Sequence, residues 1–194
     1  MSQSYRKLKM PDNGGLEMDL FEAIKKRHCY RGAFTDTSVP REDLEKIVQA
    51  GLDAPSGKNC QTTRFVIVDE PELLEQIGQM HPANKAMQQA KAFIACIIDK
   101  NPEAIYEGFE FQVEDCAAAV ENMLLAITAL GYASVWIDGW LRVENHNETI
   151  GKLLGAPRAK IVRILLPIGV PEKEVKGPKK MPSPERAWFN QYGQ

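Results

Sequence analysis

The longest apolar stretch of the chain restricts its fold more than any other feature. It covers residues 117–130 with three polar interruptions, so it is too short and too polar to span a bilayer. The surrounding pattern predicts one long helix over residues 110–130 that ends at Gly131, a residue type common just after a helix. One face can pack on the core of its own domain, and we expect the other to need a second surface, such as a partner subunit. Apolar side chains lie on more than one face: Ala117, Ala118, Val120, Met123, Leu124, Leu125, Ile127 and Leu130.

Composition and charge narrow the class of protein. A chain of 194 residues is long enough for one domain with its own core and too short for two. Lys and Arg number 24 against 26 Asp and Glu, and the net charge of −2 argues against a sequence-independent nucleic-acid binder. The first 15 residues contain no apolar run of the kind a secretory signal has, so a cytoplasmic protein without a membrane anchor is predicted.

The cysteines indicate no metal site. Cys29, Cys60, Cys96 and Cys116 are widely spaced, with no Cys-x-x-Cys pair and no partnered histidines. In a reducing compartment such residues are expected to be free thiols.

The remaining pattern alternates helices with short apolar strands, which predicts an α/β or α+β domain over residues 18–170, after a polar leader of residues 1–17. The first helix follows Asp19 and has an apolar face of Leu20, Phe21 and Ile24. The other expected helices begin after Pro40, at Pro71 and at Glu148, and the expected strands cover residues 65–68, 93–98, 133–137 and 161–168.

The last residues, 171–194, form a proline-rich tail that is expected to make no regular element. Trp188, Phe189 and Tyr192 lie near its end. Because solvating three aromatic side chains is unfavourable, we expect the tail to lie extended on another surface.

The common nucleotide-binding and hydrolase motifs are absent. No Gly-x-Gly-x-x-Gly follows a strand, and no Gly-x-Ser-x-Gly occurs. Residues 51–59 resemble a phosphate-binding loop superficially, but their glycines have the wrong spacing and Asn59 replaces the hydroxyl residue that would hold magnesium.

Three local clusters remain, and each has a structural alternative. Residues 25–31 (Lys-Lys-Arg-His-Cys-Tyr-Arg) form either an anion clamp or the solvated end of a helix. Residues 54–61 (Ala-Pro-Ser-Gly-Lys-Asn-Cys-Gln) offer small residues and two amides to a ligand, or form an ordinary turn. Residues 131–140 contain an Asp-Gly pair close to two tryptophans. They either present backbone N–H groups beside a flat aromatic ligand or pack in the core.

Taken together and in this order, the three clusters resemble the FMN-dependent nitroreductase family. The family's basic pattern is similar to residues 27–31, with Cys29 where serine is common, and its signature Ala-Pro-Ser-x-x-Asn-x-Gln stands intact at residues 54–61. Its long helix and the following strand are similar to residues 115–139. The resemblance implies an α+β fold with a central mixed, mainly antiparallel sheet flanked by helices, and an intertwined homodimer in which the tail docks on the partner.

The resemblance also implies two FMN molecules at the dimer interface. Arg27, His28, Cys29 and Arg31 would hold the phosphate and the N1/O2 side of the flavin, with Lys179 and Lys180 of the tail near the phosphate. The Asp138–Gly139 backbone would lie near flavin N5. The cofactor-binding residues implied for the three clusters and the tail are Arg27, His28, Cys29, Arg31, Pro55, Ser56, Asn59, Gln61, Trp136, Ile137, Asp138, Gly139, Lys179 and Lys180, with Pro55, Ser56 and Asn59 reaching in from the partner subunit.

The implied activity is the ping-pong transfer of two electrons from NAD(P)H to a nitroaromatic, a quinone or a similar small acceptor. FMN carries the redox chemistry, so no side chain is named as catalytic. Two alternatives stay open: other flavin chemistry on the same fold (enone reduction, dehalogenation or flavin breakdown), and a non-enzymatic flavin-binding module.

Overall fold

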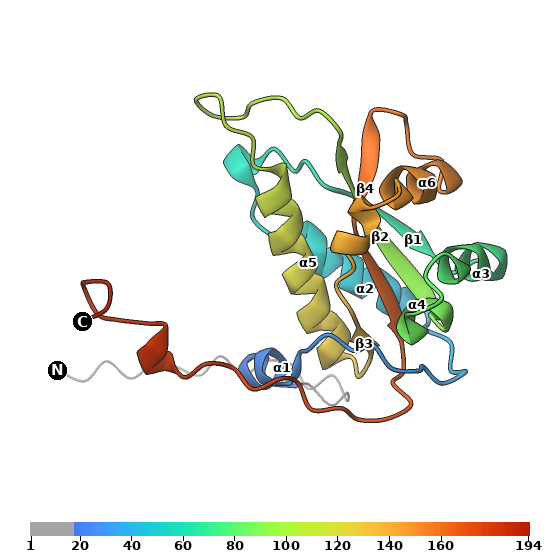
Figure 1. Cartoon of the computed structure of the whole chain (residues 1–194), viewed down its shortest axis with the longest axis horizontal. Coiled ribbons are helices and arrows are strands. Elements are labelled where there is room, and N and C mark those ends of the chain that lie inside the picture. The colour runs from blue at the N-terminus through green and yellow to red at the C-terminus, as the bar shows by residue number, and fades with distance from the viewer. Residues whose placement is uncertain (1–17) are drawn as a thin grey trace.

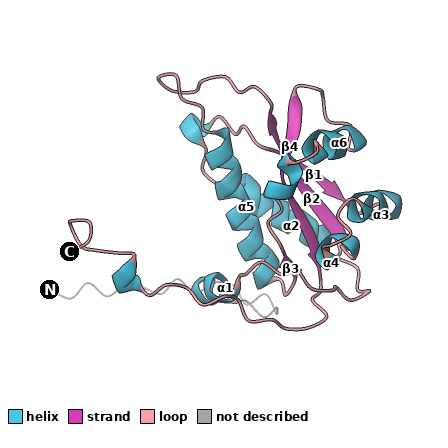
Figure 2. Ribbon diagram, in the orientation of Figure 1, coloured by secondary structure: helices cyan, strands magenta, loops and turns pink. Residues whose placement is uncertain are grey.

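The computed structural model describes residues 18–194, so the predicted leader lies outside the described residues. A four-stranded sheet forms the centre, with strand order β1-β2-β4-β3 and antiparallel pairing throughout (Figures 1 and 2). A single parallel bridge, from Cys29 to Ser134, adds to the sheet.

The strands are β1 (Arg64–Val68), β2 (Ala92–Asp99), β3 (Ala133–Ser134) and β4 (Lys160–Gly169). The α-helices are α1 (Leu20–Lys26), α2 (Arg41–Leu52), α3 (Pro71–Gln79), α4 (Lys85–Gln88), α5 (Gln112–Ala129) and α6 (His146–Leu153), and the 3-10 turns are η1 (Gly57–Asn59), η2 (Gly139–Arg142) and η3 (Ser183–Glu185).

Helices cover both faces of the sheet, and the central strand β2 shows why. Phe93, Ala95 and Ile97 pack in one core cluster, with α3 and α6, whereas Ile94 and Cys96 pack in the other, with α2 and α5. Alternate side chains of a strand point to opposite faces, so an all-apolar strand has to be covered on both sides. The predicted α+β class with a mainly antiparallel sheet is confirmed.

Strand β3 is shorter than the predicted strand over residues 133–137. Ala133 and Ser134 pair with the end of β4, and the next residue of β4 in this register is Pro167. The carbonyl of the neighbouring Ile168 accepts a hydrogen bond from the Lys91 N–H, on the β2 side of the strand. Successive residues of a strand direct their backbone groups to opposite sides, so the backbone groups of Pro167 face β3. Proline has no N–H to donate, and the ladder stops there. Pairing resumes only as a single bridge between Ile137 and Leu165.

Helix α5 ends as predicted. Gly131, just after its last turn, has φ of +83°, in the left-handed region that glycine adopts without strain. Within residues 18–194 no helix is long and apolar enough to cross a membrane.

The apolar face predicted for the first helix is present, but its side chains are exposed within residues 18–194. Asp19 caps α1 by accepting a hydrogen bond from the Phe21 N–H at 2.9 Å. Leu20, Phe21 and Ile24 are nevertheless 60%, 77% and 50% exposed, and Ala23 is the buried member of α1. The helix therefore carries an apolar face without a partner among residues 18–194.

The tail is extended, apart from the single turn η3, and runs away from the domain (Figure 1). Phe189 and Tyr192 are 93% and 90% exposed, and the rings of Trp188 and Tyr192 contact each other at a tilt of 53°, with centroids 4.5 Å apart. The aromatic residues that predict docking thus find no surface for it among the described residues. Whether a partner subunit supplies that surface stays a prediction.

Candidate functional site

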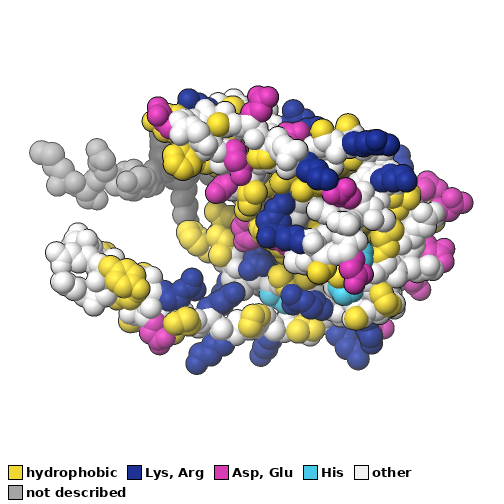
Figure 3. Space-filling view, turned by 45° about the horizontal axis from the view of Figure 1, so that its top comes forward, with side chains coloured by type: hydrophobic (Ala, Val, Ile, Leu, Met, Phe, Trp, Pro, Cys, Tyr) yellow, Lys and Arg dark blue, Asp and Glu magenta, His cyan; other side chains and the backbone are white. Residues whose placement is uncertain are grey.

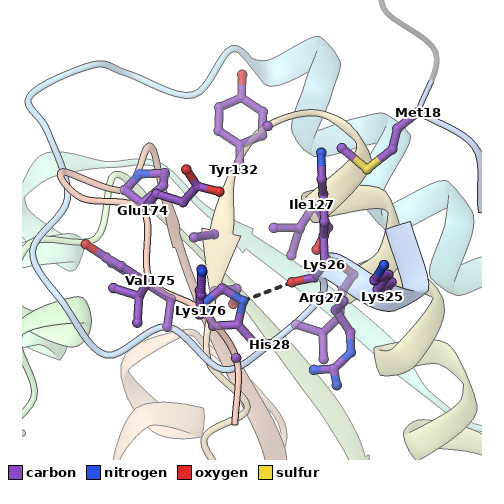
Figure 4. Close-up of a pocket in the computed structure, with 18 of the residues that line it drawn as sticks. Met18, Lys25, Lys26, Arg27, His28, Ile127, Tyr132, Glu174, Val175 and Lys176 are labelled. Carbon is purple, nitrogen blue, oxygen red and sulfur yellow. Dashed lines mark hydrogen bonds between the residues drawn. The ribbon is translucent and has the colours of Figure 1, made fainter. Parts of the chain in front are cut away.

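A cavity of about 570 Å³ lies between α1, the last turns of α5, β3 and the start of the tail (Figure 4). Leu124, Ile127 and Ala133 supply an apolar part of its lining. The cationic side chains that line it are Lys25, Lys26, Arg27, Lys173 and Lys176, against Glu22 and Glu174. Dark blue Lys and Arg side chains are seen along the lower edge of the molecule in Figure 3. Such a cavity suits an anion that also has apolar surface.

Arg27 and Lys26 differ sharply, although they are neighbours. Arg27 follows the last residue of α1, and its Nε lies 3.1 Å from the Glu121 carboxylate of α5, with the Arg27 side chain only 20% exposed. Lys26 is half exposed and pairs with Glu22 one turn back. The structural alternative for this cluster, a solvated helix end, therefore describes Lys26 but not Arg27.

Two buried polar atoms beside this cavity have no hydrogen-bond partner among the described residues: His28 Nε2 and Ser134 Oγ. The other ring nitrogen, His28 Nδ1, lies 2.9 Å from the Lys26 carbonyl, as the dashed line in Figure 4 shows. Both residues line the cavity. Because buried polar groups are nearly always paired, these two atoms point to a polar ligand that completes the site.

The other residues that the resemblance implies for the phosphate do not line this cavity. Cys29 is half-buried beside β3, where the neighbouring Tyr30 N–H donates to the Ser134 carbonyl at 2.8 Å. Arg31 is exposed and does not line the cavity. Lys179 and Lys180 are exposed in the tail, and Lys173 and Lys176 line the cavity in their place.

Residues 55–61, which we call the amide loop, have a strained backbone. Lys58, Asn59 and Gln61 all lie in the left-handed region, with φ of 47°, 57° and 49°. Each such conformation costs a non-glycine residue about 1–2 kcal/mol. Pro55, Ser56 and Gln61 line a second cavity, of about 440 Å³, with Asp115 and Ala119 of α5. Backbone strain at three positions of one short loop is often found in functional loops.

The amide loop and the first cavity lie beside different parts of α5. The Gly57 N–H donates to Asp115 in the first turn of α5, while the first cavity uses residues 124–128 near its other end. Twelve residues of α-helix separate Asp115 from Ile127, which is about 18 Å along the axis. Figure 1 shows η1 near the start of α5 and α1 near its end. The two clusters therefore do not meet within one chain.

The third cluster forms a charged turn between β3 and η2. The carboxylate of Asp138 accepts two hydrogen bonds from Arg142, at 2.7 and 2.9 Å, and pairs with Arg163 of β4. Burial opposes ionisation of Asp138, but the two arginines outweigh it, so the pKa of Asp138 is lowered. Its carboxylate is thus occupied, and it is the backbone here that remains for a ligand.

The neighbours of Asp138 divide between core and surface. Trp136 packs against the core on the α2–α5 side, and Ile137 is buried against the other cluster. Apart from the adjoining Asp138 and Trp140, no described residue has an atom within 4 Å of the place where a Cβ of Gly139 would stand. The core-packing alternative therefore holds for Trp136, whereas Gly139 leaves open space.

Trp140, the second tryptophan, stacks with two histidines, and this stack gives a pH prediction. The rings of His81 and His146 lie nearly parallel to the indole, with their centroids 4.7 and 4.0 Å from it. Burial, and then the nearby His146, lower the pKa of His81.

Folding thus disfavours protonated His81, so the free energy of unfolding should fall as pH drops from about 6.5 through the lowered pKa. Urea unfolding at pH 7.5 and 5.5 measures the loss, and His81→Gln should reduce it; an unchanged pH dependence in His81→Gln would contradict the assignment.

Three residues that join these features were not singled out from the sequence. They are Glu121, which pairs with Arg27; Asp115, which holds the amide loop; and Arg163, which pairs with Asp138. Arg163 carries a signal in hindsight, because it is a charge inside an otherwise apolar strand. It lies at the irregularity where the β2–β4 register shifts. The two acidic residues look like any polar position of a long helix.

A helix-covered antiparallel sheet with a basic cavity at the β3 side defines the class of protein by its fold, α+β. Comparison with known proteins gives the family. The family model described as the nitroreductase family matches residues 24–170, most of the chain, and the chain belongs to that family. The resemblance drawn from the three clusters is confirmed, and with it the predicted class, an oxidoreductase of the nitroreductase type.

Individual relatives agree with this assignment. A protein of Methanothermobacter thermautotrophicus, whose name pairs NADH dehydrogenase with NAD(P)H nitroreductase, is 34% identical over 170 residues, which are 88% of this chain and 86% of the relative. An FMN-dependent nitroreductase of Clostridium difficile is 28% identical, with a TM-score of 0.73 over 88% of this chain and 98% of that one. A Desulfovibrio desulfuricans protein described as a nitroreductase and solved in complex with FMN is 27% identical, with a TM-score of 0.71 over 91% of this chain and 99% of that one.

Proposed function

We propose that the protein binds FMN and, as a homodimer, passes two electrons from NAD(P)H to a nitroaromatic, a quinone or a similar small acceptor by a ping-pong mechanism. The observation that carries the proposal is the basic cavity with the two unpartnered atoms, His28 Nε2 and Ser134 Oγ. Family membership and the FMN-dependent relatives support the same ligand. When bound, FMN supplies the redox chemistry, and the chain supplies position and electrostatics.

Two residues of the cavity, together with residues outside its lining, are proposed to hold the parts of this cofactor. Arg27 and His28 would bind its phosphate, since a charged donor gives stronger hydrogen bonds to an anion than a neutral one. Cys29 and the tail lysines Lys179 and Lys180 complete the proposed phosphate site. Arg31 would place a positive charge at the N1/O2 side of the flavin, where it stabilises negative charge. Trp136 and Ile137 would border the ring, and the backbone of Asp138 and Gly139 would face N5.

The second half of the proposed site comes from another copy of the chain. The amide loop lies beside the opposite part of α5 from the cavity, so in the dimer the partner subunit's Pro55, Ser56, Asn59 and Gln61 would reach the flavin. Three surfaces without partners support such a dimer: the exposed apolar face of α1, the half-buried Ala117, Ala118 and Leu125 on the outer face of α5, and the tail aromatics. Figure 1 shows these elements along one side of the domain. We propose residues 18–170 as the flavin domain and residues 171–194 as the tail that docks on the partner.

The cofactor test uses the purified chain. Cofactor released by heat and run against FMN and FAD standards should be FMN, since the chain has one compact basic cavity and no dinucleotide motif. The holoprotein should oxidise NADH or NADPH only when an electron acceptor is added. FAD in place of FMN, or no flavin after reconstitution, would contradict the proposal.

The dimer test measures the mass of the holoprotein. Light scattering should give twice the chain mass of 21.7 kDa, and a monomer that holds flavin would contradict the shared site.

A further inference from the structure

We propose that Asp115 is a positioning residue for this flavin site: its buried carboxylate holds the amide loop in the strained shape that presents Ser56 and Asn59 to the partner subunit. The inference rests on the proposed function, and it adds a residue that lies outside all three sequence clusters.

The geometry around Asp115 is that of a two-point anchor. Asp115 lies in the first turn of α5 and is 7% exposed. One carboxylate oxygen accepts a hydrogen bond from the Gly57 N–H at 2.8 Å, and the other accepts one from the Thr62 hydroxyl at 3.0 Å. These two donors lie on either side of the three left-handed residues, so a single side chain fixes both ends of the strained segment.

The other contacts of the loop are internal to it or lie at the surface. At the surface, the Arg64 guanidinium donates to the Gln61 carbonyl, and Lys58 Nζ lies 4.7 Å from the centre of the Tyr106 ring. Inside the loop, the Gln61 N–H donates to Ser56 Oγ at 3.0 Å, and two backbone hydrogen bonds close the turn at η1. Outside it, Gly57 lies so close to Phe111 that a Cβ would stand 2.9 Å from the ring. Lys58 and Asn59 themselves are exposed. A strained backbone persists only when its surroundings over-determine it, and Asp115 is the buried polar group that does so here.

The chemistry of the anchor also explains why it is a carboxylate. Two separate donors, a backbone N–H and a hydroxyl, need two acceptors, and the two oxygens of one carboxylate supply them at fixed spacing. Alanine supplies neither. Asparagine keeps the shape: its oxygen accepts from Gly57, and its NH₂ can donate to the Thr62 hydroxyl oxygen. Asp115→Ala and Asp115→Asn therefore separate loss of the anchor from loss of the charge.

The direct test measures FMN retention, by ultrafiltration and visible spectrum, in the Asp115→Ala homodimer. We expect at least a tenfold weaker FMN affinity, with Asp115→Asn within about threefold of the original protein. Glu114→Ala, an exposed neighbour in the same turn, is the matched control and should bind normally. Thr62→Val removes one of the two contacts and should lie in between. Circular dichroism and thermal unfolding show whether each variant is folded.

A mixed dimer excludes a merely structural role. Asp115→Ala leaves the cavity intact but loosens its loop, and Arg27→Ala damages the cavity but keeps its loop. If each loop serves the other chain's cavity, a heterodimer of the two variants contains one intact site, and it should retain about one FMN per dimer where both parent homodimers fail. Heterodimers are isolated with two different affinity tags.

The outcomes separate this inference from the proposed function. Normal FMN binding by Asp115→Ala, or a heterodimer that retains no more FMN than its parents, overturns the role of Asp115. Equal loss of FMN in Asp115→Ala and Asp115→Asn overturns the two-point anchor. If the unmodified protein takes up no FMN, the proposed function fails, and the inference fails with it.

Discussion

Replacing Arg27 with alanine should weaken FMN binding about 10- to 100-fold, whereas Lys26→Ala should change it less than about threefold. The difference follows from the surroundings of two adjacent cations. Arg27 is largely buried at the cavity wall beside Glu121, and a hydrogen bond to a charged group is worth about 1.5–3 kcal/mol. Lys26 is solvated and pairs with Glu22 on the helix surface, where ion pairs contribute about 0–1 kcal/mol.

Titration of the apoproteins with FMN, followed by flavin fluorescence, measures both dissociation constants. The control is the fold: both variants should keep the far-ultraviolet circular dichroism and the thermal midpoint of the parent, because neither side chain is part of the core clusters. Equal affinities in Arg27→Ala and Lys26→Ala would refute the assignment of Arg27 to the phosphate.

Deleting residues 178–194 should weaken the dimer at least about tenfold and lower FMN occupancy, while the domain itself still folds. The backbone hydrogen bonds recorded for this segment are internal to it, and its side chains are exposed apart from the half-buried Trp188, so the domain loses little of its own packing. Three aromatic side chains that dock on a partner would each bury roughly 150–250 Å². The truncation keeps Gly177, whose backbone packs against His28 of the cavity.

Sedimentation equilibrium measures the dimer constant, and absorbance measures the flavin content. The double variant Lys179→Ala/Lys180→Ala is the matched control, because it removes two cations of the tail and keeps its aromatics. Loss of flavin in both variants, with a weaker dimer only in the truncation, would assign the lysines to the phosphate and the aromatics to the interface. A truncated chain that dimerises and binds FMN like the parent would refute docking of the tail.

The fold was largely predictable because its signals are local. Pro71 begins α3 and Gly131 follows α5 as predicted, and the mostly apolar pattern of residues 161–168 identified strand β4. Two features have non-local causes. The early end of β3 depends on a proline in the neighbouring strand, and the apolar face of α1 is exposed within residues 18–194.

For the candidate site, sequence reasoning predicted the residues that form contiguous motifs and missed those that support them. Arg27 and His28 could be named from one short segment, and both line the cavity. Asp115 and Glu121 could not, because a single acidic residue on a helix gains meaning only from the segment that folds against it. The amide loop was recognised by its residue types, whereas its left-handed backbone has no reliable signature in residues such as Lys58.

Pro167 has a consequence for the backbone groups of the segment that follows β3. Proline has no N–H, so the carbonyl of Val135, which lies opposite Pro167 in this register, accepts no backbone hydrogen bond within residues 18–194. Ile137 exchanges both of its backbone hydrogen bonds with Leu165, so the N–H groups of Trp136 and Asp138 on either side of it face away from β4. These two N–H groups donate to no backbone carbonyl within residues 18–194, and they therefore stay available to a small molecule.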